Sequence, residues 1–434
     1  MPNETDSYTV TPRQPWWKAI GPALITACVV FGPGSLIVST KVGAIFGYGF
    51  LWLLLLTGVF MGTYVAMSAR IGVVGGATPL TLLAGTLGRR IAFLVGLTLC
   101  LVCSAFQFSN NTAFAMAVSA FFPGATGQYL LTIQITSLVI INGLIALFLF
   151  TATHIYAAVE RMMKFMVAVV LVSFLSSLIL AGPGLLDVLW GFIPQIPEGF
   201  SFGRVPGPDG KDWAPMLLIA GLLGTTFSVG GAFFQGNLVR EKGWSIADYR
   251  NSIRDSIAGV CVLTGVSMVI MITAATVLSG KPANNLAQLA EVLRPALGPT
   301  AYWIFCIGLV PIAMNPFMIN AMIGGAILSD AVGKPCKLSD PIPRKMTVVV
   351  LLIGMIAAVW GLASGRRPDE LIVFGQALTV LGNPLMAAAL LFLANQRSIM
   401  GQHRNSVAIN VVAGLGFLVV LFAAGCRVAG LMGY

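Results

Sequence analysis

Two short glycine-rich segments interrupt long apolar stretches of this sequence. They are Gly32–Pro33–Gly34–Ser35 and Ser228–Val229–Gly230–Gly231. Glycine removes side-chain bulk and proline removes a backbone donor, so a helix is expected to unwind at the first segment and, more weakly, at the second. A half-helix that begins after such a break presents unpaired N–H groups and a partial positive charge. The pair therefore predicts a site for a negatively charged group, whereas either segment alone also fits a kink or a close helix contact.

Small polar side chains accompany the two breaks. The hydroxyls of Ser35, Thr225, Thr226 and Ser228 could add hydrogen bonds to a bound group. Replacing large ligating side chains with glycine and serine also leaves room for something bigger than a bare ion. We therefore expect the breaks and these hydroxyls to form one binding site.

Three further residues could lie on the path to this site. Lys41 is six residues beyond Ser35, about 9 Å along a helix, where its charge could draw an anion inward. The alternative is a lysine that reaches from the bilayer to its surface. Asn110 and Asn111 could add hydrogen bonds to a substrate, although packing between helices is the more common use of such residues in a span.

The sequence lacks the side chains that usually hold a metal ion inside a membrane. Its two histidines, His154 and His403, fall in expected loops, and its seven cysteines show no metal-ligand spacing. The acidic residues Glu160, Asp255 and Asp330 lie near the ends of apolar stretches with Lys or Arg close by, which favours interfacial ion pairs. We expect no metal site, no cofactor and, without a nucleophile–base pair, no enzyme.

The composition places these residues in a membrane. Of 434 residues, 57% are hydrophobic and 9% are charged, against roughly 25% charged in a soluble domain. The net charge of +10 could indicate nucleic-acid binding, but the basic residues lie in short segments between apolar stretches, which is the pattern of membrane topology. The expected partners are therefore the lipid bilayer and a small substrate, with no nucleic acid, and the protein is expected to be a monomer.

A membrane span needs about 20 mainly apolar residues, and eleven segments qualify. They are residues 19–45, 49–70, 91–119, 129–151, 156–181, 215–239, 254–279, 299–328, 346–364, 369–393 and 407–429. The fold class is thus an all-α polytopic membrane protein.

The spans divide the chain into two halves. We expect a cytoplasmic tail (1–18), a first repeat of five spans (19–181), an external loop (182–214), a second repeat of five spans (215–393), and an eleventh span with the C-terminus (394–434). The two breaks are 196 residues and five spans apart, and interrupted helices at matching positions indicate an inverted-repeat transporter with its site at mid-membrane.

The distribution of basic residues predicts the orientation. With the N-terminus inside, 17 of the 25 Lys and Arg residues lie on the cytoplasmic side and 8 on the other. This bias favours a protein of the cell membrane with a cytoplasmic N-terminus and an external C-terminus.

At these residues the sequence resembles the Nramp family (natural resistance-associated macrophage proteins). The similarity runs through the first, second, sixth and tenth spans, in the stretches Gly21–Pro22–Ala23 to Ser35, Val42–Gly43–Ala44, Phe46–Gly47–Tyr48, Leu51–Trp52–Leu53–Leu54–Leu55, Ala220–Gly221–Leu222–Leu223–Gly224–Thr225, Asn237–Leu238–Val239, Leu371 to Gln376 and Asn383–Pro384. The resemblance implies a LeuT-type fold of 11 transmembrane helices, with a five-plus-five inverted repeat and broken helices 1 and 6. It also implies alternating access and transport of divalent transition metals, usually with protons.

The sequence departs from the family at the metal site. Where the family has Asp-Pro-Gly-Asn in its first broken helix, this chain has Gly32 for the Asp and Ser35 for the Asn. Where the family has Met-Pro-His in the sixth, this chain has Ser228–Val229–Gly230, and the second His of that helix aligns with Gln235. The family's glutamine in the tenth helix is kept as Gln376, which joins the expected substrate-binding set.

The departures extend to proton coupling. The acidic pair of the family's third helix falls near Phe106 and Ser109, so the coupling ion, Na⁺ or H⁺, stays open. We hypothesise a secondary transporter for a small anion, most specifically bicarbonate, a substrate associated with an Nramp-related branch. The alternatives are a divalent cation transporter for Mn²⁺ or hydrated Mg²⁺, and a receptor on the same scaffold that does not transport.

Overall fold

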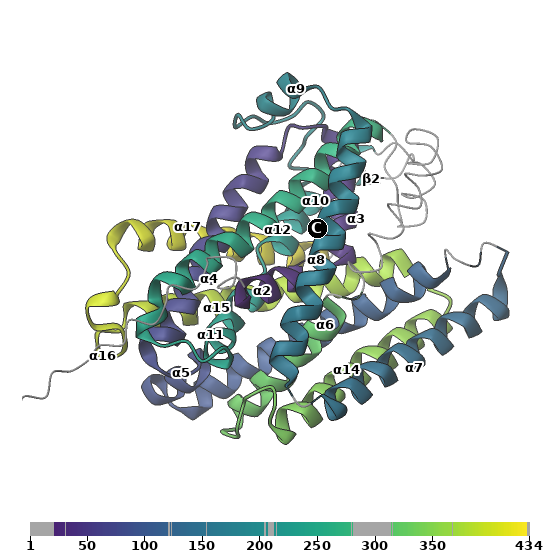
Figure 1. Ribbon diagram of the computed structural model, residues 1–434. Coiled ribbons are helices and arrows are strands. Elements are labelled where there is room, and N and C mark those ends of the chain that lie inside the picture. The colour runs from purple at the N-terminus through teal and green to yellow at the C-terminus, as the bar shows by residue number, and fades with distance from the viewer. Residues whose placement is uncertain are drawn as a thin grey trace, which may run out of the picture.

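The computed structural model describes residues 21–431 apart from 31, 120–121, 123, 153, 204, 207–211, 214, 279, 281–313, 315 and 367. The described helices and strands are, in chain order, α2 (Pro22–Val30), α3 (Pro33–Phe46), α4 (Leu51–Gly75), α5 (Pro79–Leu87), α6 (Arg89–Ser119), α7 (Gly127–Thr151), α8 (Ile155–Ala181), α9 (Leu185–Trp190), β1 (Val205–Pro206), β2 (Asp212–Trp213), α10 (Pro215–Thr226), α11 (Val229–Glu241), η1 (Ile246–Asp248), α12 (Tyr249–Val277), α14 (Pro341–Ala363), α15 (Pro368–Asn395), α16 (Arg397–Met400), η2 (Gly401–His403) and α17 (Val407–Leu431). Residues 316–331 are also helical. The molecule is a bundle of long helices (Figure 1).

The all-helical membrane architecture agrees with the prediction from composition. Within the described residues, nine helices are long and apolar enough to span a membrane, or ten if the bent pair α2 and α3 counts as one span. The eighth expected span, 299–328, lies partly in 281–313, outside the described residues. The count of eleven spans and the five-plus-five repeat therefore stay predictions.

Both predicted breaks are present, at slightly different positions. The helices α2 and α3 are bent by 62°, and Gly32, with an extended backbone (φ −109°, ψ 165°), precedes the first residue of α3. In the sixth span, α10 ends at Thr226 and α11 begins at Val229. Gly34, Ser35 and Gly230–Gly231 thus lie in the first turns of the half-helices and not in unwound chain, because Pro33 fits the first helical turn without losing a bond.

The broken spans lie at the centre of the bundle. The span formed by α10 and α11 is 94% buried over its most apolar window, and α12 packs against α2, α3 and α4. Glycines permit this packing: a Cβ on Gly43 of α3 would collide with the carbonyl oxygen of Met271 on α12 and lie 3.1 Å from the Ala274 Cβ. Buried, closely packed half-helices keep the two breaks in a fixed relation.

The expected external loop, 182–214, is partly structured. It contains α9 and a two-residue antiparallel ribbon in which Val205 pairs with Trp213. The loop docks on the turn between α3 and α4: the Trp52 amide donates to the Gly191 carbonyl (3.0 Å), and the Phe200 ring contacts Phe46 and Phe50. It therefore covers one end of the broken first span.

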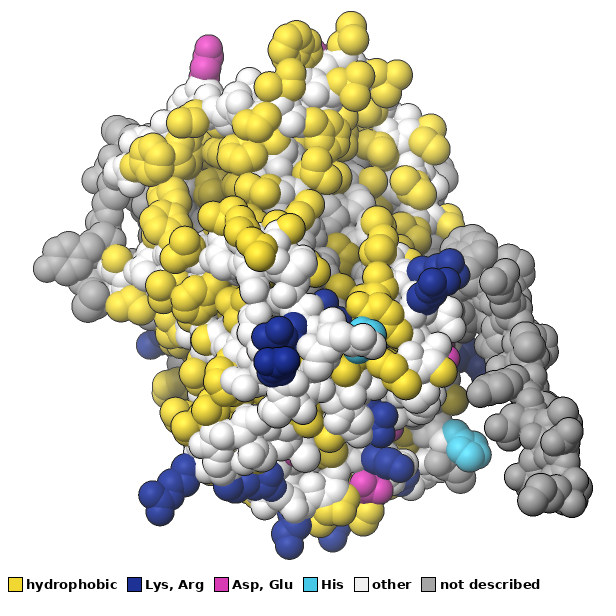
Figure 2. Space-filling model, turned by 90° about the vertical axis from the view of Figure 1, so that its left-hand side faces the viewer, with side chains coloured by type: hydrophobic (Ala, Val, Ile, Leu, Met, Phe, Trp, Pro, Cys, Tyr) yellow, Lys and Arg dark blue, Asp and Glu magenta, His cyan; other side chains and the backbone are white. Residues whose placement is uncertain are grey.

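The surface separates apolar from basic regions. On the face shown in Figure 2, hydrophobic side chains cover most of the upper part, and Lys and Arg side chains gather in the lower half. The uneven distribution of Lys and Arg along the sequence predicts such a separation. The orientation of the termini stays a prediction.

The close approach at Gly43 is testable. We expect Gly43→Ala to lower the free energy of unfolding by about 1–3 kcal/mol, because the added methyl group has no space against the α12 backbone. The matched control is Gly62→Ala in α4, whose Cβ would lie 3.6 Å from Val260, an ordinary contact. Thermal unfolding of both variants in detergent checks this, and equal midpoints would contradict it.

Candidate functional site

The structure brings the two breaks together. A Cβ on Gly231, in the first turn of α11, would lie 3.4 Å from the Val29 Cβ in the last turn of α2. Gly32, Pro33, Gly34 and the hydroxyl-bearing Ser35 are all buried. The segments that sequence analysis paired across 196 residues are therefore neighbours in space.

Each half-helix begins with backbone N–H groups that have no hydrogen-bond acceptor within the described part of the chain. The first intrahelical bonds run from the Leu36 amide to the Gly32 carbonyl (3.1 Å) and from the Ala232 amide to the Ser228 carbonyl (3.1 Å). The N–H groups of Gly34 and Ser35, and those of the residues 229–231, precede these bonds. The Ser228 side chain, 2% exposed, does not cap α11. Two helix N-termini with such donors favour a negatively charged or strongly accepting group.

The two asparagines of α6 have different roles. A Cβ on Gly32 would lie 3.8 Å from the Asn110 Oδ1, and neither polar atom of the fully buried Asn110 amide has a hydrogen-bond partner among the described residues. Asn111 instead donates to the Gln107 carbonyl (2.8 Å) and accepts from the Asn142 amide (2.8 Å). Asn110 thus faces the break, whereas Asn111 holds helices together, so its candidacy for the substrate path is not supported by its contacts.

The polar side chains near the second break differ in whether they have hydrogen-bond partners. Thr225 donates to the Gly221 carbonyl (2.8 Å) within its own helix, whereas the fully buried Thr226 hydroxyl has no partner among the described residues. Asn383 of α15 donates to the Phe227 carbonyl at the break (3.3 Å). Gln376 lies in α15, but its side chain is outside what the structure describes.

The described residues offer no metal-ligating cluster. No group of three or more His, Cys, Asp or Glu side chains in that part of the chain could hold a metal ion. The donors at the breaks are N–H groups, hydroxyls and the Asn110 amide. In that part of the chain a dehydrated divalent cation at the breaks would find no carboxylate to offset its desolvation.

The buried carboxylate of Asp255 caps the first half-helix. Asp255, which is fully buried, accepts from the amides of Gly21 (2.8 Å) and Ala23 (2.9 Å) at the start of α2 and from Gln235 Nε2 (3.2 Å). Gln235 Oε1 in turn accepts from the Thr26 hydroxyl (2.6 Å). Among the described residues these hydrogen bonds, and not the predicted ion pair, are the direct contacts of Asp255, with the charge of Lys242 nearby. The carboxylate links α2, α11 and α12 because a helix N-terminus compensates its charge.

The other two acidic residues also differ from one another. Glu160 forms the predicted ion pair with Lys164 (2.6 Å) and a second with Lys242 (3.3 Å). Asp330 instead accepts from the hydroxyls of Thr78 (2.5 Å) and Thr81 (2.8 Å). These groups join helices at their ends, and none of the described carboxylates lies at the breaks.

Sequence analysis missed Arg427. Its Nη2 atom lies 2.6 Å from where a Cβ on Gly221 would be, so the guanidinium group packs against the backbone of α10 at this glycine. Gly221 is seven residues before Ser228, about 10 Å along the helix. Lys41 is half-buried on α3. The contact between Arg427 and Gly221 joins residues far apart in the chain, so no local sequence pattern could have predicted it.

Buried apolar helices with two adjacent helix breaks at the centre of the bundle are the architecture of a polytopic membrane protein of the transporter class. A sequence profile of the family described as Natural resistance-associated macrophage protein-like matches residues 23–429, and the chain belongs to this family.

Relatives and solved structures agree with the family. The divalent metal cation transporter MntH of Verminephrobacter eiseniae is 24% identical over 411 residues, covering 92% of this chain and 86% of that protein. MntH of Mycobacterium leprae is also 24% identical, with 94% and 90% covered. The crystal structure of the Eremococcus coleocola manganese transporter in complex with an aromatic bis-isothiourea substituted compound superposes with a TM-score of 0.81 at 18% identity, covering 98% of this chain and 90% of that one. These likenesses establish the Nramp fold.

The role of Asp255 as a cap is testable. We expect Asp255→Ala to lower the free energy of unfolding by about 2 kcal/mol or more, because it leaves two N–H groups and the Gln235 amide without their acceptor. Asp255→Asn keeps an acceptor oxygen, so its free energy of unfolding should lie between those of Asp255→Ala and the unmodified protein. Release of α2 should also speed maleimide labelling of Cys28, which is fully buried in α2.

The matched control is Asp187→Asn, in the first turn of the short helix α9. Its melting midpoint and Cys28 labelling rate should equal those of the unmodified protein. If Asp255→Ala labels no faster than this control, the carboxylate does not hold α2 in place.

Proposed function

We propose that this chain is an alternating-access transporter for a small anion, with bicarbonate as the specific candidate. The observation that carries the proposal is the donor set at the two breaks: unpaired N–H groups of α3 and α11, the Thr226 hydroxyl and the Asn110 amide, with glycine at position 32. A small planar anion rich in acceptor oxygens matches such donors. We further propose that it acts as a monomer in the cell membrane, with its N-terminus in the cytoplasm.

Electrostatics supports the proposal beyond the immediate site. Arg427 of α17 lies against Gly221 of α10, about 10 Å along that helix from the second break, and Lys41 lies about 9 Å along α3 from Ser35. Positive groups in a low-dielectric passage raise the local concentration of anions and lower that of cations. Both observations point to the same sign of cargo.

The second candidate is a divalent cation, Mn²⁺ or Mg²⁺. The comparisons favour it, because the relatives are named divalent metal cation transporters and the similar solved structure is a manganese transporter. With the donors described here, such a cation would have to keep much of its water, as Mg²⁺ commonly does in proteins. The relatives' names thus favour a cation as the substrate, whereas the donor groups of this chain favour an anion.

Flux measurements on purified protein in liposomes decide between the candidates. The anion proposal expects a bicarbonate-driven change in internal pH above that of empty vesicles, with and without a Na⁺ gradient to identify the coupling ion. The cation candidate expects Mn²⁺ or Mg²⁺ uptake and no bicarbonate signal. Binding of labelled bicarbonate without flux would indicate a receptor.

Substitution of Gly32 sharpens this test. The position has space, since the atom nearest to a Cβ is the Pro316 Cγ at 3.6 Å, and its φ of −109° suits any residue. A carboxylate about 4 Å from a bound anion costs roughly 4 kcal/mol at an effective dielectric of 20, so we expect Gly32→Asp to reduce bicarbonate flux by about a hundredfold or more. Gly32→Asn, of matched size and no charge, should retain much more of it.

The opposite response would support the cation. If Gly32→Asp raised Mn²⁺ or Mg²⁺ uptake while Gly32→Asn did not, the site would be a cation site that lacks a ligand. Equal effects of the two variants on bicarbonate flux would show that bulk, not charge, matters at this position.

A second variant tests the contribution of Arg427. We expect Arg427→Gln to slow bicarbonate uptake several-fold, with the difference shrinking as ionic strength rises, because salt screens the attraction. The control is Arg397→Gln in the short helix α16, which should leave uptake unchanged. A slower uptake that does not depend on salt would assign Arg427 a packing role.

A further inference from the structure

A groove between α4 and α12 combines an apolar wall with three arginines. It has a volume of about 640 Å³, and besides the arginines it is lined mainly by Val59, Gly62, Ala66, Met67, Ile253 and Ile257. The α4 residues recur at helical spacing and so lie along one face of that helix. Because α4 and α12 contact each other along this face, the groove runs between two spans.

The groove opens toward the lipid and is about one leaflet long. The side chains of Val59 and Ile257 are 50% and 58% exposed. From Val59 to Arg70, α4 rises by about 16 Å, close to half of a hydrocarbon core of about 30 Å. An acyl chain of one leaflet therefore matches the length of the apolar wall.

The arginines gather at one end of the groove. Arg70 is near the end of α4, and Arg250 and Arg254 are in the first turns of α12, which runs in the opposite direction. Arg70 is 6% exposed; one of its amino groups donates to the Asn405 Oδ1, and its Nε atom has no partner among the described residues. No acidic side chain lines the groove, and none of the three arginines forms an ion pair within the described residues.

We propose that this groove binds one anionic phospholipid, with its phosphate on Arg70, Arg250 and Arg254 and an acyl chain along the wall of α4. Guanidinium groups bind phosphate with paired N–H donors, and basic pockets between spans hold lipid head groups. The predicted orientation puts these arginines on the cytoplasmic side. The site is separate from the helix breaks and does not depend on which cargo is carried.

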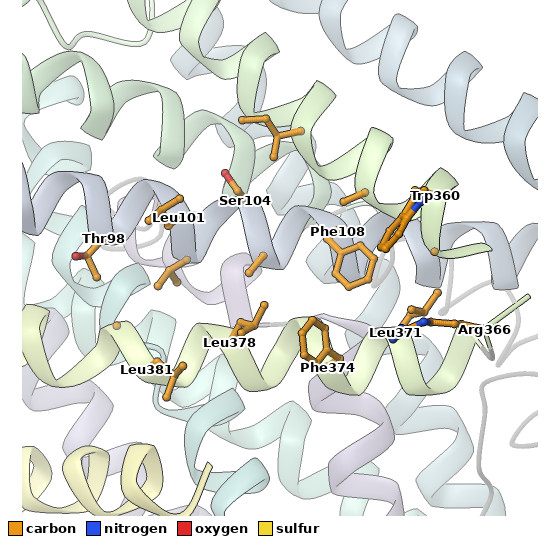
Figure 3. A pocket seen from close by; sticks show the side chains of 16 residues that line it. Thr98, Leu101, Ser104, Phe108, Trp360, Arg366, Leu371, Phe374, Leu378 and Leu381 are labelled. Carbon is orange, nitrogen blue, oxygen red and sulfur yellow. The ribbon is translucent and has the colours of Figure 1, made fainter. Parts of the chain in front are cut away.

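A second groove in the same molecule provides the comparison. It lies between α6, α14 and α15, has a volume of about 580 Å³, and has a single arginine, Arg366, at one end (Figure 3). Its apolar wall includes Leu101, Phe108 and Phe374. A groove of similar size with one third of the arginines should hold lipid with much less preference for an anionic head group.

The test measures lipid binding to the full-length protein in detergent. Phosphatidylglycerol, diacylglycerol with the same chains, and inorganic phosphate are added separately, and native mass spectrometry and thermal unfolding are recorded. We expect one tightly retained phosphatidylglycerol that raises the melting midpoint, because a ligand of the folded state stabilises it. Diacylglycerol and phosphate alone should each have a much smaller effect.

Two kinds of variant separate the head group from the chain. The double variant Arg250→Gln/Arg254→Gln removes exposed charges and should weaken phosphatidylglycerol binding roughly tenfold or more. Ala66→Phe should displace the acyl chain by filling the groove. The control variant Arg366→Gln, in the second groove, should bind phosphatidylglycerol as tightly as the unmodified protein does.

Three outcomes would overturn the proposal. Undiminished phosphatidylglycerol retention by the double variant would show that the arginines do not bind it. Equal stabilisation by inorganic phosphate alone would indicate a site for a free anion. A protein dimer that excludes lipid from the groove would identify a second copy of the chain as the occupant.

Discussion

Backbone polar groups inside a membrane need partners from the protein, because hydrocarbon provides none. Two interrupted helices at the centre of this bundle release such groups, and the surrounding structure satisfies many of them. At the second break Asn383 donates to the Phe227 carbonyl, and at the start of the first broken span, away from its break, Asp255 accepts from the amides of Gly21 and Ala23. Among the described residues, the first-turn N–H groups of α3 and α11 have no such partner, and these are the groups that the proposed substrate would contact. The fold of the bundle and the chemistry of the site follow from the same requirement.

Whether the substrate is an anion or a cation depends on which side chains lie beside these N–H groups. In the family pattern that this sequence resembles, an Asp stands at the first break, and a bound cation is balanced by that charge. Here the position is Gly32, and the nearest polar side chain is the neutral amide of Asn110. The positive charges of Lys41 and Arg427 lie farther along the half-helices. Membership of the Nramp family fixes the scaffold and the transport function, while these substitutions bear on the substrate.

Contacts at the two ends of the broken first span show how the scaffold is held. At one end the loop containing α9 packs on the turn between α3 and α4, and at the other Asp255 and Gln235 tie α2 to α11 and α12. The buried Asp255 carboxylate is stabilised there because the N-terminus of α2 is directed at it, Gln235 donates to it, and Lys242 lies close enough to add a favourable charge. The arginines of the α4–α12 groove have no such partner in the described protein, and a lipid phosphate would provide one.

The amino-acid sequence alone was sufficient to predict a membrane protein of long helices and the positions of both breaks, because hydropathy, glycine and proline act locally along the chain. Local pattern could not distinguish Asn110 from Asn111, or a helix cap at Asp255 from an ion pair. Those outcomes depend on residues far apart in the chain: Asp255 meets Gly21, and Arg427 meets Gly221. Only tertiary packing brings such residues together, because burial and close approach decide which polar groups find a partner and which stay free for a ligand.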